Sequence, residues 1–540
     1  MIRAFAVERR ATIAAAVLAI GLVLAARQWG VRALGGADTY AYVTEAGLLR
    51  AGSLIVREDV VRDSPWPGGL GTWAPIGFRE VPDERDAITP VYPPGFPLLI
   101  ALFQRLFGFC GTFWVVPLCA GAVVWLTHVL GRRLFDRSDI ALASALLVAA
   151  SPVFLYESMA TMSDVPATAA WTLALVLAMA GRAFPSGLAA AAAILIRPNL
   201  APVAGALILW SLLRDVDAKR SAGRWGTSTL RVLAGIAPAV AAIASLNAAL
   251  FGSPLVSGYG ELGDLYSVRY LWPNVTRFTR WIAETDTPVI VLAGLFFVHP
   301  RFIAQARVPF ARVLLGVFIA AVVASYLFYL PFDAWWYLRF LLPTWPVVMV
   351  LTAAGIHAIA RAIARRHAVI VFSTIVLTLA IHGVVVAANR SAFTLWAGEG
   401  RYIDVARYLA AATEPNAVFI TVQHSGSIRV YADRLTLHFQ RLDRRWLDRA
   451  VARLQASGRH PYIVLDAGEV EAFRERFGAD NRLGALDWPP KAAYEDSLVV
   501  VYDSDLRTAA SAPLQIPSSR GKSARTCVRP AVWPPRLRWD

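Results

Sequence analysis

The chain has 540 residues, of which 57% are hydrophobic and 17% are charged, and its mean hydropathy is +0.50. Soluble globular proteins carry about 25% charged residues, so this composition excludes an ordinary soluble domain and predicts a polytopic membrane protein. The formal net charge of +15 raises the alternative of nucleic-acid binding. Most basic residues, however, stand in short loops between apolar segments, where they set topology, and no soluble basic patch with interleaved aromatic residues occurs. We therefore expect the lipid bilayer, and no nucleic acid, as a partner.

The first apolar segment follows a basic stretch that contains Arg3, Arg9 and Arg10. This order resembles a secretory signal, but no small-residue cleavage site follows, so we expect a retained first helix. A membrane-spanning helix needs about 20 mostly apolar residues, and the sequence contains about eleven candidate crossings. They are residues 11–30, 113–130, 140–154, 165–180, 187–196, 200–213, 230–251, 288–298, 313–330, 340–360 and 368–388.

Arginine placement orients these crossings, because cytoplasmic loops hold the excess of arginine and lysine. With the N-terminus inside, every inside loop is basic; the residues are Arg132, Arg133 and Arg137, then Arg182, then Arg214, Lys219, Arg220 and Arg224, then Arg301 and Arg307, and finally Arg361, Arg365 and Arg366. We therefore predict a multi-pass protein of the cytoplasmic (inner) membrane with a cytoplasmic N-terminus. Its C-terminal domain is then periplasmic or extracellular.

Two apolar stretches are not predicted to be continuous membrane-spanning helices. Residues 93–108, in the first outer loop (27–112), are apolar but interrupted by Pro97 and Arg105, and we interpret them as a helix in the outer interface. The alternative, a true span, would put the arginine-rich loops outside. Around Arg197-Pro198-Asn199, proline disfavours helix in the residue before it, so we expect a broken or re-entrant pair of helices.

After residue 390 the hydrophobicity falls and the pattern becomes mixed α/β. Helices are expected at 401–412, 444–457 and 468–477, and strands at 417–422, 462–465 and 498–502. These patterns predict a transmembrane catalytic domain over 1–390, an outer-face α/β domain over 391–505 and a disordered, Pro- and Arg-rich tail over 506–540. Cys110, Cys119 and Cys527 show neither metal spacing nor a disulfide framework, and we interpret them as apolar fillers.

Four groups of residues at the predicted outer face are candidates for chemistry. They are Asp38 with Tyr40 and Tyr42, the segment that begins at Tyr92, Glu157 with Asp164, and Arg197 with Arg339. A lipid-phosphate sugar donor places its phosphate at headgroup depth, where arginine binds phosphate oxygens bidentately. A carboxylate can accept the proton of an attacking hydroxyl.

These groups receive the following roles. Asp38 is the expected general base, with Asp164 and Glu157 as further catalytic candidates, and Arg197 and Arg339 form the expected phosphate clamp. Arg269 is a further donor-phosphate candidate, because it stands in a long loop, 252–287, and long loops are often functional. Tyr40, Tyr42 and Tyr92 are the substrate-binding candidates.

In their residues and their order along the chain, these motifs resemble those of the membrane-embedded C-type (GT-C) glycosyltransferases, in particular the group that contains bacterial protein O-mannosyltransferases and lipid A aminoarabinose transferases. The matching motifs are Gly36-Ala37-Asp38-Thr39-Tyr40-Ala41-Tyr42, Tyr92-Pro93-Pro94-Gly95-Phe96-Pro97, Gly131-Arg132-Arg133-Leu134-Phe135, Ser163-Asp164-Val165-Pro166, Ile196-Arg197-Pro198-Asn199 and Arg339-Phe340-Leu341-Leu342-Pro343. The resemblance implies a GT-C-like helical fold, a polyprenyl-phosphate-linked sugar as donor, inversion at the anomeric carbon, and a catalytic aspartate in the first loop, which falls on Asp38.

Two departures from relatives limit what the resemblance implies. Eukaryotic protein O-mannosyltransferases carry an acidic pair in the first loop, whereas Thr39 follows Asp38; a divalent metal stays possible, but no ligand cluster indicates one. The segment His424-Ser425-Gly426-Ser427-Ile428-Arg429-Val430-Tyr431 resembles soluble tails of bacterial members rather than those of well-studied transferases. The acceptor is therefore left open.

Each candidate also has a structural alternative. Asp38 and Asp164 could cap the helices that follow them, the two arginines could be interfacial anchors, and the tyrosines could form an aromatic belt. We predict an integral membrane glycosyltransferase that moves a sugar to an acceptor hydroxyl. The best competitor is a lipid or sugar transporter or flippase, because broken helices and intramembrane charges also mark transporters; an inactive membrane sensor or scaffold is a third alternative.

Overall fold

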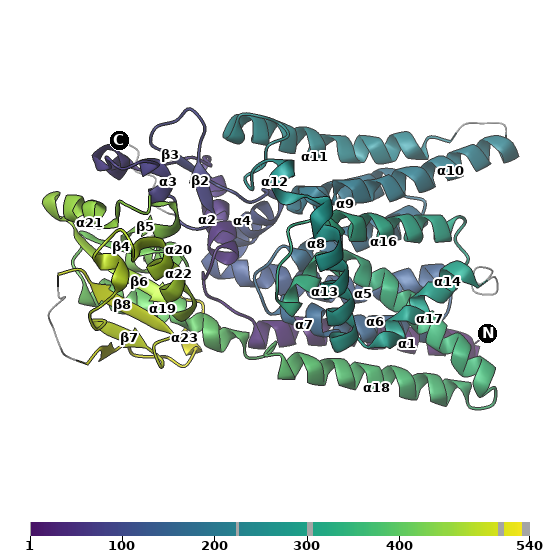
Figure 1. Cartoon of the computed structure of the whole chain (residues 1–540). Coiled ribbons are helices and arrows are strands. Elements are labelled where there is room, and N and C mark those ends of the chain that lie inside the picture. The colour runs from purple at the N-terminus through teal and green to yellow at the C-terminus, as the bar shows by residue number, and fades with distance from the viewer. Residues whose placement is uncertain (1, 223–225, 300–305, 506–511, 532–540) are drawn as a thin grey trace. The chain divides into compact units, whose positions relative to one another are not determined.

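A computed structural model describes residues 2–222, 226–299, 306–505 and 512–531 (Figure 1). The loop residues Arg224 and Arg301 lie outside the described residues. The chain divides into two compact units. The helical unit comprises Met1–Gly30, Phe113–Leu246 and Gly260–Thr394, and the mixed unit comprises Val31–Thr112, Asn247–Tyr259 and Leu395–Asp540. The predicted first outer loop therefore groups with the C-terminal residues rather than with the helices that flank it in sequence.

The helical unit is built of α-helices and short 3-10 helices (Figure 1). In chain order they are α1 (Ile2–Trp29), η2 (Phe109–Trp114), α5 (Val115–Phe135), α6 (Ser138–Ala150), α7 (Pro152–Ser158), α8 (Asp164–Met179), α9 (Ala183–Ile196), η3 (Pro198–Val203), α10 (Ala204–Ala222), α11 (Ser228–Phe251), α12 (Leu262–Leu265), η4 (Val268–Tyr270), α13 (Leu271–Thr285), η5 (Pro288–Gly294), α14 (Leu295–Val298), α16 (Ala311–Leu327), η6 (Trp335–Thr344), α17 (Trp345–Ile363) and α18 (Ala368–Asn389). The ends of η2 and α11 reach into the mixed unit. The predicted helix break at Arg197 is present, because α9 ends there and η3 follows.

Six described helices are long and apolar enough to cross a membrane, and two bent pairs would raise the number to eight. The pair α6 and α7 bends by 62° and the pair η4–α13 and η5–α14 by 111°. A proline stands after each bend, Pro152 after the first and Pro288 after the second. Proline lacks a backbone N–H and disfavours helix in the residue before it, which accounts for the two interruptions. The predicted crossing over 140–154 is therefore divided at Ser151. The unit is a bundle of apolar helices with six to eight candidate spans, and the count of about eleven stays a prediction.

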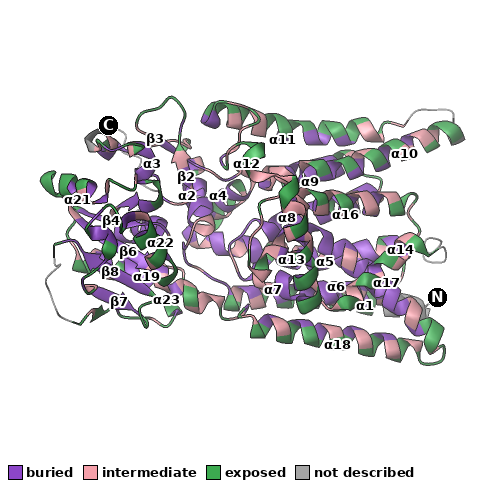
Figure 2. Cartoon of the chain, in the orientation of Figure 1, coloured by how far each residue is buried: buried purple, intermediate pink, exposed green. Residues whose placement is uncertain are grey.

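Several of these helices carry apolar side chains on their outer surface. Only 22% of the apolar window of α11, and 22% of that of α18, is buried inside the structure, and Leu230 and Leu377 are exposed. Figure 2 shows the exposed and intermediate residues along both helices. Exposed apolar surface on this scale is unfavourable in water, so it supports a lipid environment for the helical unit.

The mixed unit contains a six-stranded sheet in the order β5-β4-β6-β8-β7-β9. Its strands are β4 (Ala417–Thr421), β5 (Leu435–His438), β6 (His460–Asp466), β7 (Ala492–Tyr494), β8 (Val499–Asp503) and β9 (Leu514–Gln515). β4 pairs in parallel with β5 and β6, whereas β8 is antiparallel to β6 and β7, and β9 is parallel to β7. The helices of this part are α19 (Leu395–Ala412), α20 (Ser425–Ala432), η7 (Phe439–Arg441), α21 (Leu447–Ala456), α22 (Ala467–Phe477), η8 (Leu483–Ala485) and α23 (Lys522–Arg525).

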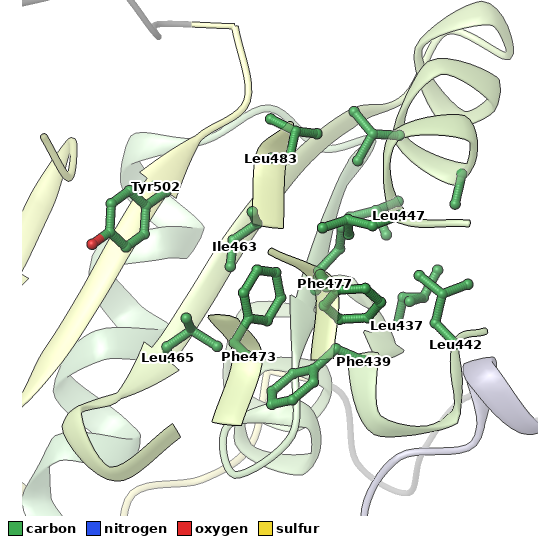
Figure 3. Packing of buried hydrophobic residues seen from close by; sticks show 14 of the residues in the cluster. Leu437, Phe439, Leu442, Leu447, Ile463, Leu465, Phe473, Phe477, Leu483 and Tyr502 are labelled. Carbon is green, nitrogen blue, oxygen red and sulfur yellow. The ribbon is translucent and has the colours of Figure 1, made fainter. Parts of the chain in front are cut away.

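The first loop supplies the remaining elements of the mixed unit. They are α2 (Asp38–Ala51), β1 (Val56–Arg57), η1 (Asp59–Asp63), α3 (Gly69–Trp73), β2 (Phe78–Glu80), β3 (Ala87–Pro90) and α4 (Gly95–Phe107). Trp66 and Trp73 of this loop belong to one buried apolar cluster together with residues of the six-stranded sheet and of α22. Figure 3 shows part of this cluster, with Phe473 and Phe477 beside Ile463. Burying one such side chain contributes about 1.5–3 kcal/mol, so the loop and the sheet share a core.

The cysteine interpretation was wrong for two of the three residues. Cys110 and Cys527 form a disulfide, with Cα atoms 5.8 Å apart and 417 residues between them in sequence. The predicted disordered tail also differs from the structure where it is described: residues 512–531 form β9 and α23 and carry Cys527, while 506–511 and 532–540 lie outside the described residues. The composition of this segment indicated disorder, because composition carries no information about a disulfide partner or a neighbouring strand elsewhere in the chain.

Candidate active site

Asp38 is the first residue of α2, and the hydroxyl of Tyr92 donates a hydrogen bond to its Oδ1 over 2.5 Å. The capping alternative does not describe it, because Ala37 precedes the helix and α2 has no side-chain cap hydrogen bond. A carboxylate in the first turn is favoured by the helix dipole. Burial, and the charge of Asp38, raise the pKa of Tyr92. Its phenol therefore stays protonated and oriented toward the half-buried carboxylate.

An aromatic cluster surrounds this pair. The ring centroids of Tyr42 and Tyr92 lie 4.5 Å apart, and those of Tyr92 and Tyr259 lie 5.6 Å apart. Tyr40 points elsewhere, toward Phe78 at 5.8 Å, and burial raises its pKa to about 12. The structure thus brings Tyr42 and Tyr92 together beside Asp38 and gives Tyr40 a packing position.

Helix α20, which contains most of the His424–Tyr431 motif, holds the start of α2. The ring of Tyr40 packs on Gly426 so closely that a Cβ there would overlap it. The hydroxyl of Tyr431 accepts a hydrogen bond from the Leu34 backbone N–H at 3.0 Å, and Ser425 Oγ accepts one from Ile76 N–H at 3.0 Å. The motif therefore packs against, and hydrogen-bonds to, the loop that carries Asp38.

Charged groups strengthen the same connection. Arg429 of α20 pairs with Glu58 of the first loop and donates to the carbonyl of Trp73 at 2.6 Å. His424, which directly precedes α20, is buried and contacts Asp466 through Nε2 at 2.8 Å, and Arg401 pairs with Asp466 at 3.3 Å. His424 is thus part of the support of α20, which explains its position in the motif.

In the helical unit, Asp164 forms a buried ion pair with Arg197. Asp164 is the first residue of α8 and its side chain is fully buried, while the Arg197 side chain is 15% exposed. The guanidinium of Arg197 also lies 5.5 Å from the centre of the Phe340 ring. Asp164 therefore orients Arg197 and partly balances its charge.

Arg339 lies beside the same ring. Its guanidinium is 5.7 Å from the centre of Phe340 and 5.0 Å from that of Tyr337. Tyr326 stacks on Phe340 at 4.7 Å, and Phe332 stacks on Tyr337 at 4.2 Å. Sequence reasoning interpreted Tyr337 as an aromatic-belt residue and did not connect these rings with the two arginines, although the density of aromatic residues between 326 and 340 signals the cluster.

The other two candidates of the helical unit have less defined roles. Glu157 is buried in α7, next to Tyr156, which stacks on Trp336. Trp336 in turn stacks on Tyr337, the ring beside the Arg339 guanidinium. Arg269 is exposed and contacts its neighbour Tyr270, to whose hydroxyl it donates at 2.7 Å.

The described residues contain one group with metal-ligand types at short range. It consists of His460, Asp503 and Asp505 in the mixed unit, and the ammonium group of Lys491 lies 3.0 Å from Asp503. A cationic partner is therefore already present at Asp503. None of Asp38, Asp164 and Glu157 belongs to this group.

The predicted site residues fall into both units. Asp38, Tyr40, Tyr42 and Tyr92 belong to the mixed unit, and Glu157, Asp164, Arg197, Arg269 and Arg339 belong to the helical unit. The mixed unit thus contains a cluster around a carboxylate, and the helical unit contains a separate cluster around two arginines.

Comparisons with known proteins find one family model and several solved structures that are similar to this chain. The family model described as dolichyl-phosphate-mannose-protein mannosyltransferase matches residues 91–243, less than half of the chain. A search of curated protein sequences finds no match. Among solved structures, ArnT from Cupriavidus metallidurans bound to undecaprenyl phosphate matches with a TM-score of 0.52 at 13% identity, covering 92% of this chain and 99% of that one.

A second solved structure is the archaeal oligosaccharyltransferase AglB from Archaeoglobus fulgidus in complex with an inhibitory peptide and a dolichol-phosphate. It matches with a TM-score of 0.50 at 12% identity, covering 96% of this chain and 77% of that one. The chain therefore shares its fold with these two proteins, and the resemblance to GT-C glycosyltransferases indicated by its motifs is confirmed.

Proposed function

We propose that this chain is an integral membrane glycosyltransferase that moves a sugar from a polyprenyl-phosphate donor to an acceptor hydroxyl, with Asp38 as general base. The observation that carries the proposal is the Asp38–Tyr92 hydrogen bond at the start of α2, in a fold shared with a protein that binds undecaprenyl phosphate. A carboxylate fixed in this way can accept a proton without first having to be oriented.

The proposed reaction is a single displacement. The acceptor oxygen forms a bond to the anomeric carbon while the bond from that carbon to the phosphate oxygen breaks, which inverts the configuration. The acceptor proton passes to Asp38, and the polyprenyl phosphate leaves with the bonding electrons. Arg339 and Arg197 are the proposed ligands of the phosphate, because guanidinium groups stabilise the charge that develops on the leaving oxygen.

The disulfide supports an outer position for the mixed unit. Disulfides persist in oxidising compartments such as the bacterial periplasm and are rare in the cytosol, and Cys110–Cys527 lies in the unit that contains Asp38. The arginine-rich loops independently support a cytoplasmic N-terminus. We accordingly propose catalysis at the outer face of the cytoplasmic membrane.

The test uses purified full-length protein and a polyprenyl-phosphate sugar labelled in the sugar. The wild type should release lipid phosphate, and Asp38→Asn should lower kcat by about 10²- to 10⁴-fold, the usual contribution of a general base. Asp83→Asn is the matched control, because Asp83 is an exposed residue of the same loop with a φ of 65°, which asparagine tolerates. Undiminished release by Asp38→Asn would remove the assignment, and lipid movement without release would favour a flippase.

A further inference from the structure

A cavity of about 440 Å³ lies in the helical unit between α6, α17 and α18. It is at the end of the bundle where α6 and α18 begin and α17 ends. This is not the end that carries Arg339. α17 begins after Arg339, and the 23 residues from Arg339 to Arg361 span roughly 30 Å at the rise of a helix, about the thickness of the hydrocarbon core.

The rim of the cavity is cationic. Arg137, Arg361 and Arg365 line it, together with His357 and a single carboxylate, Asp139. Asp139 is already engaged, because Arg137 donates to both of its oxygens, at 2.6 and 3.1 Å, and His357 lies 3.5 Å away. The ion pairs found among the described residues here do not include Arg361 or Arg365. Two guanidinium groups at the rim are thus in excess over carboxylate charge.

Apart from Ser373, the rest of the cavity wall is apolar. Leu142 and Leu146 of α6 face Phe372 and Leu377 of α18 across it. Leu377 is 55% exposed, so the cavity is open along the outer surface of α18, a surface that is apolar over its length. A ligand that matches this wall has hydrocarbon chains that enter from the side, and one that matches the rim has an anionic head.

We propose that this cavity binds an anionic phospholipid, with its phosphate at Arg361 and Arg365 and an acyl chain between α6 and α18. Basic pockets between membrane helices favour anionic headgroups, and each basic residue near the surface contributes to that preference. The occupant is a membrane phospholipid rather than the sugar donor, because the cavity lies a membrane thickness away from Arg339. Lipid binding at this cavity does not require transferase activity, but the choice of a phospholipid over the sugar donor rests on the proposed donor site at Arg339.

The test is native mass spectrometry of the full-length protein, delipidated and then incubated with phosphatidylglycerol or with phosphatidylethanolamine. The wild type should retain phosphatidylglycerol and little phosphatidylethanolamine. The double variant Arg361→Gln/Arg365→Gln should bind phosphatidylglycerol roughly 30-fold more weakly. Arg366→Gln is the matched control, because Arg366 is an exposed neighbour that does not line the cavity, and it should bind as the wild type does.

Two further experiments separate the contribution of the acyl chain to binding from that of the headgroup. Leu142→Trp fills the apolar wall and leaves the charges unchanged, so it should also weaken phosphatidylglycerol binding; if it does not, the acyl-chain assignment is wrong. Soluble glycerophosphoglycerol should not compete at millimolar concentration, and effective competition would show a headgroup site without a chain site. Equal retention by the wild type and the double arginine variant would overturn the whole proposal, whatever the outcome of the Asp38 assay.

Discussion

Tyr92 donates a hydrogen bond to Asp38 across 54 residues of sequence, and this bond joins the two ends of the first loop. One partner opens helix α2 and the other precedes α4 by a few residues. The bond orients the carboxylate that we propose as general base. It also makes Tyr92 a positioning residue, whose effect on the reaction can be separated from that of the carboxylate.

Tyr92→Phe removes the hydroxyl and keeps the ring, so the packing on Tyr42 and Tyr259 should persist. A hydrogen bond to a charged group contributes about 1.5–3 kcal/mol, and its loss should lower kcat by roughly tenfold to a hundredfold while Asp38 remains able to act. The measurement is kcat and its pH profile for release of lipid phosphate. An unchanged kcat would show that the bond does not contribute.

Gly426→Ala tests whether α20 positions α2. The added methyl group overlaps the Tyr40 ring, and overpacking of this kind costs about 1–3 kcal/mol, so thermal stability and activity should both fall. Combining it with Tyr40→Ala, which vacates the space, should restore part of the activity that Gly426→Ala loses. The control is Gly468→Ala, where nothing lies within 4 Å of the new methyl group. A double variant no more active than Gly426→Ala would contradict the contact.

Cys527→Ser removes the disulfide to Cys110. Loss of a native disulfide lowers the free energy of unfolding by about 2–5 kcal/mol, and the mixed unit should become the first part of the chain to be cut in limited proteolysis. Chemical reduction of the wild type should reproduce the change and should add nothing in the variant. Cys119→Ala, which removes the cysteine outside the disulfide, should leave the proteolysis pattern unchanged.

Asp164→Asn leaves the Arg197 guanidinium without its carboxylate. Removing one partner of a buried ion pair costs about 3–5 kcal/mol, so the melting temperature in detergent should fall clearly, and Asp164→Asn/Arg197→Gln should be more stable than Asp164→Asn alone. Asp333→Asn breaks an exposed pair with Arg277 and should cost at most about 1 kcal/mol. A single Asp164 variant as stable as the wild type would show that the pair is not structural.

Much of the local structure could be predicted from short-range patterns. The expected strand over 417–422 coincides with β4, and the expected helix over 468–477 with α22, because a short continuous apolar run and capping residues act within a few positions. The break at Arg197 was predicted for the same reason, since Pro198 restricts the residue before it. The bend at Ser151 was not predicted, although Pro152 gives the same signal, because the apolar run over 140–154 has the composition of one span.

The sequence by itself determined the class of the protein and the identity of its chemical groups: apolar runs too long for a soluble fold, basic loops on one side, and acids and arginines in motifs that resemble GT-C transferases. Only the tertiary structure decided which of these groups meet. Asp38 with Tyr92, Tyr40 with Gly426, Asp164 with Arg197 and Cys110 with Cys527 are contacts between residues 33 to 417 positions apart. Such contacts depend on how separate elements pack, and no local pattern along the chain records that packing.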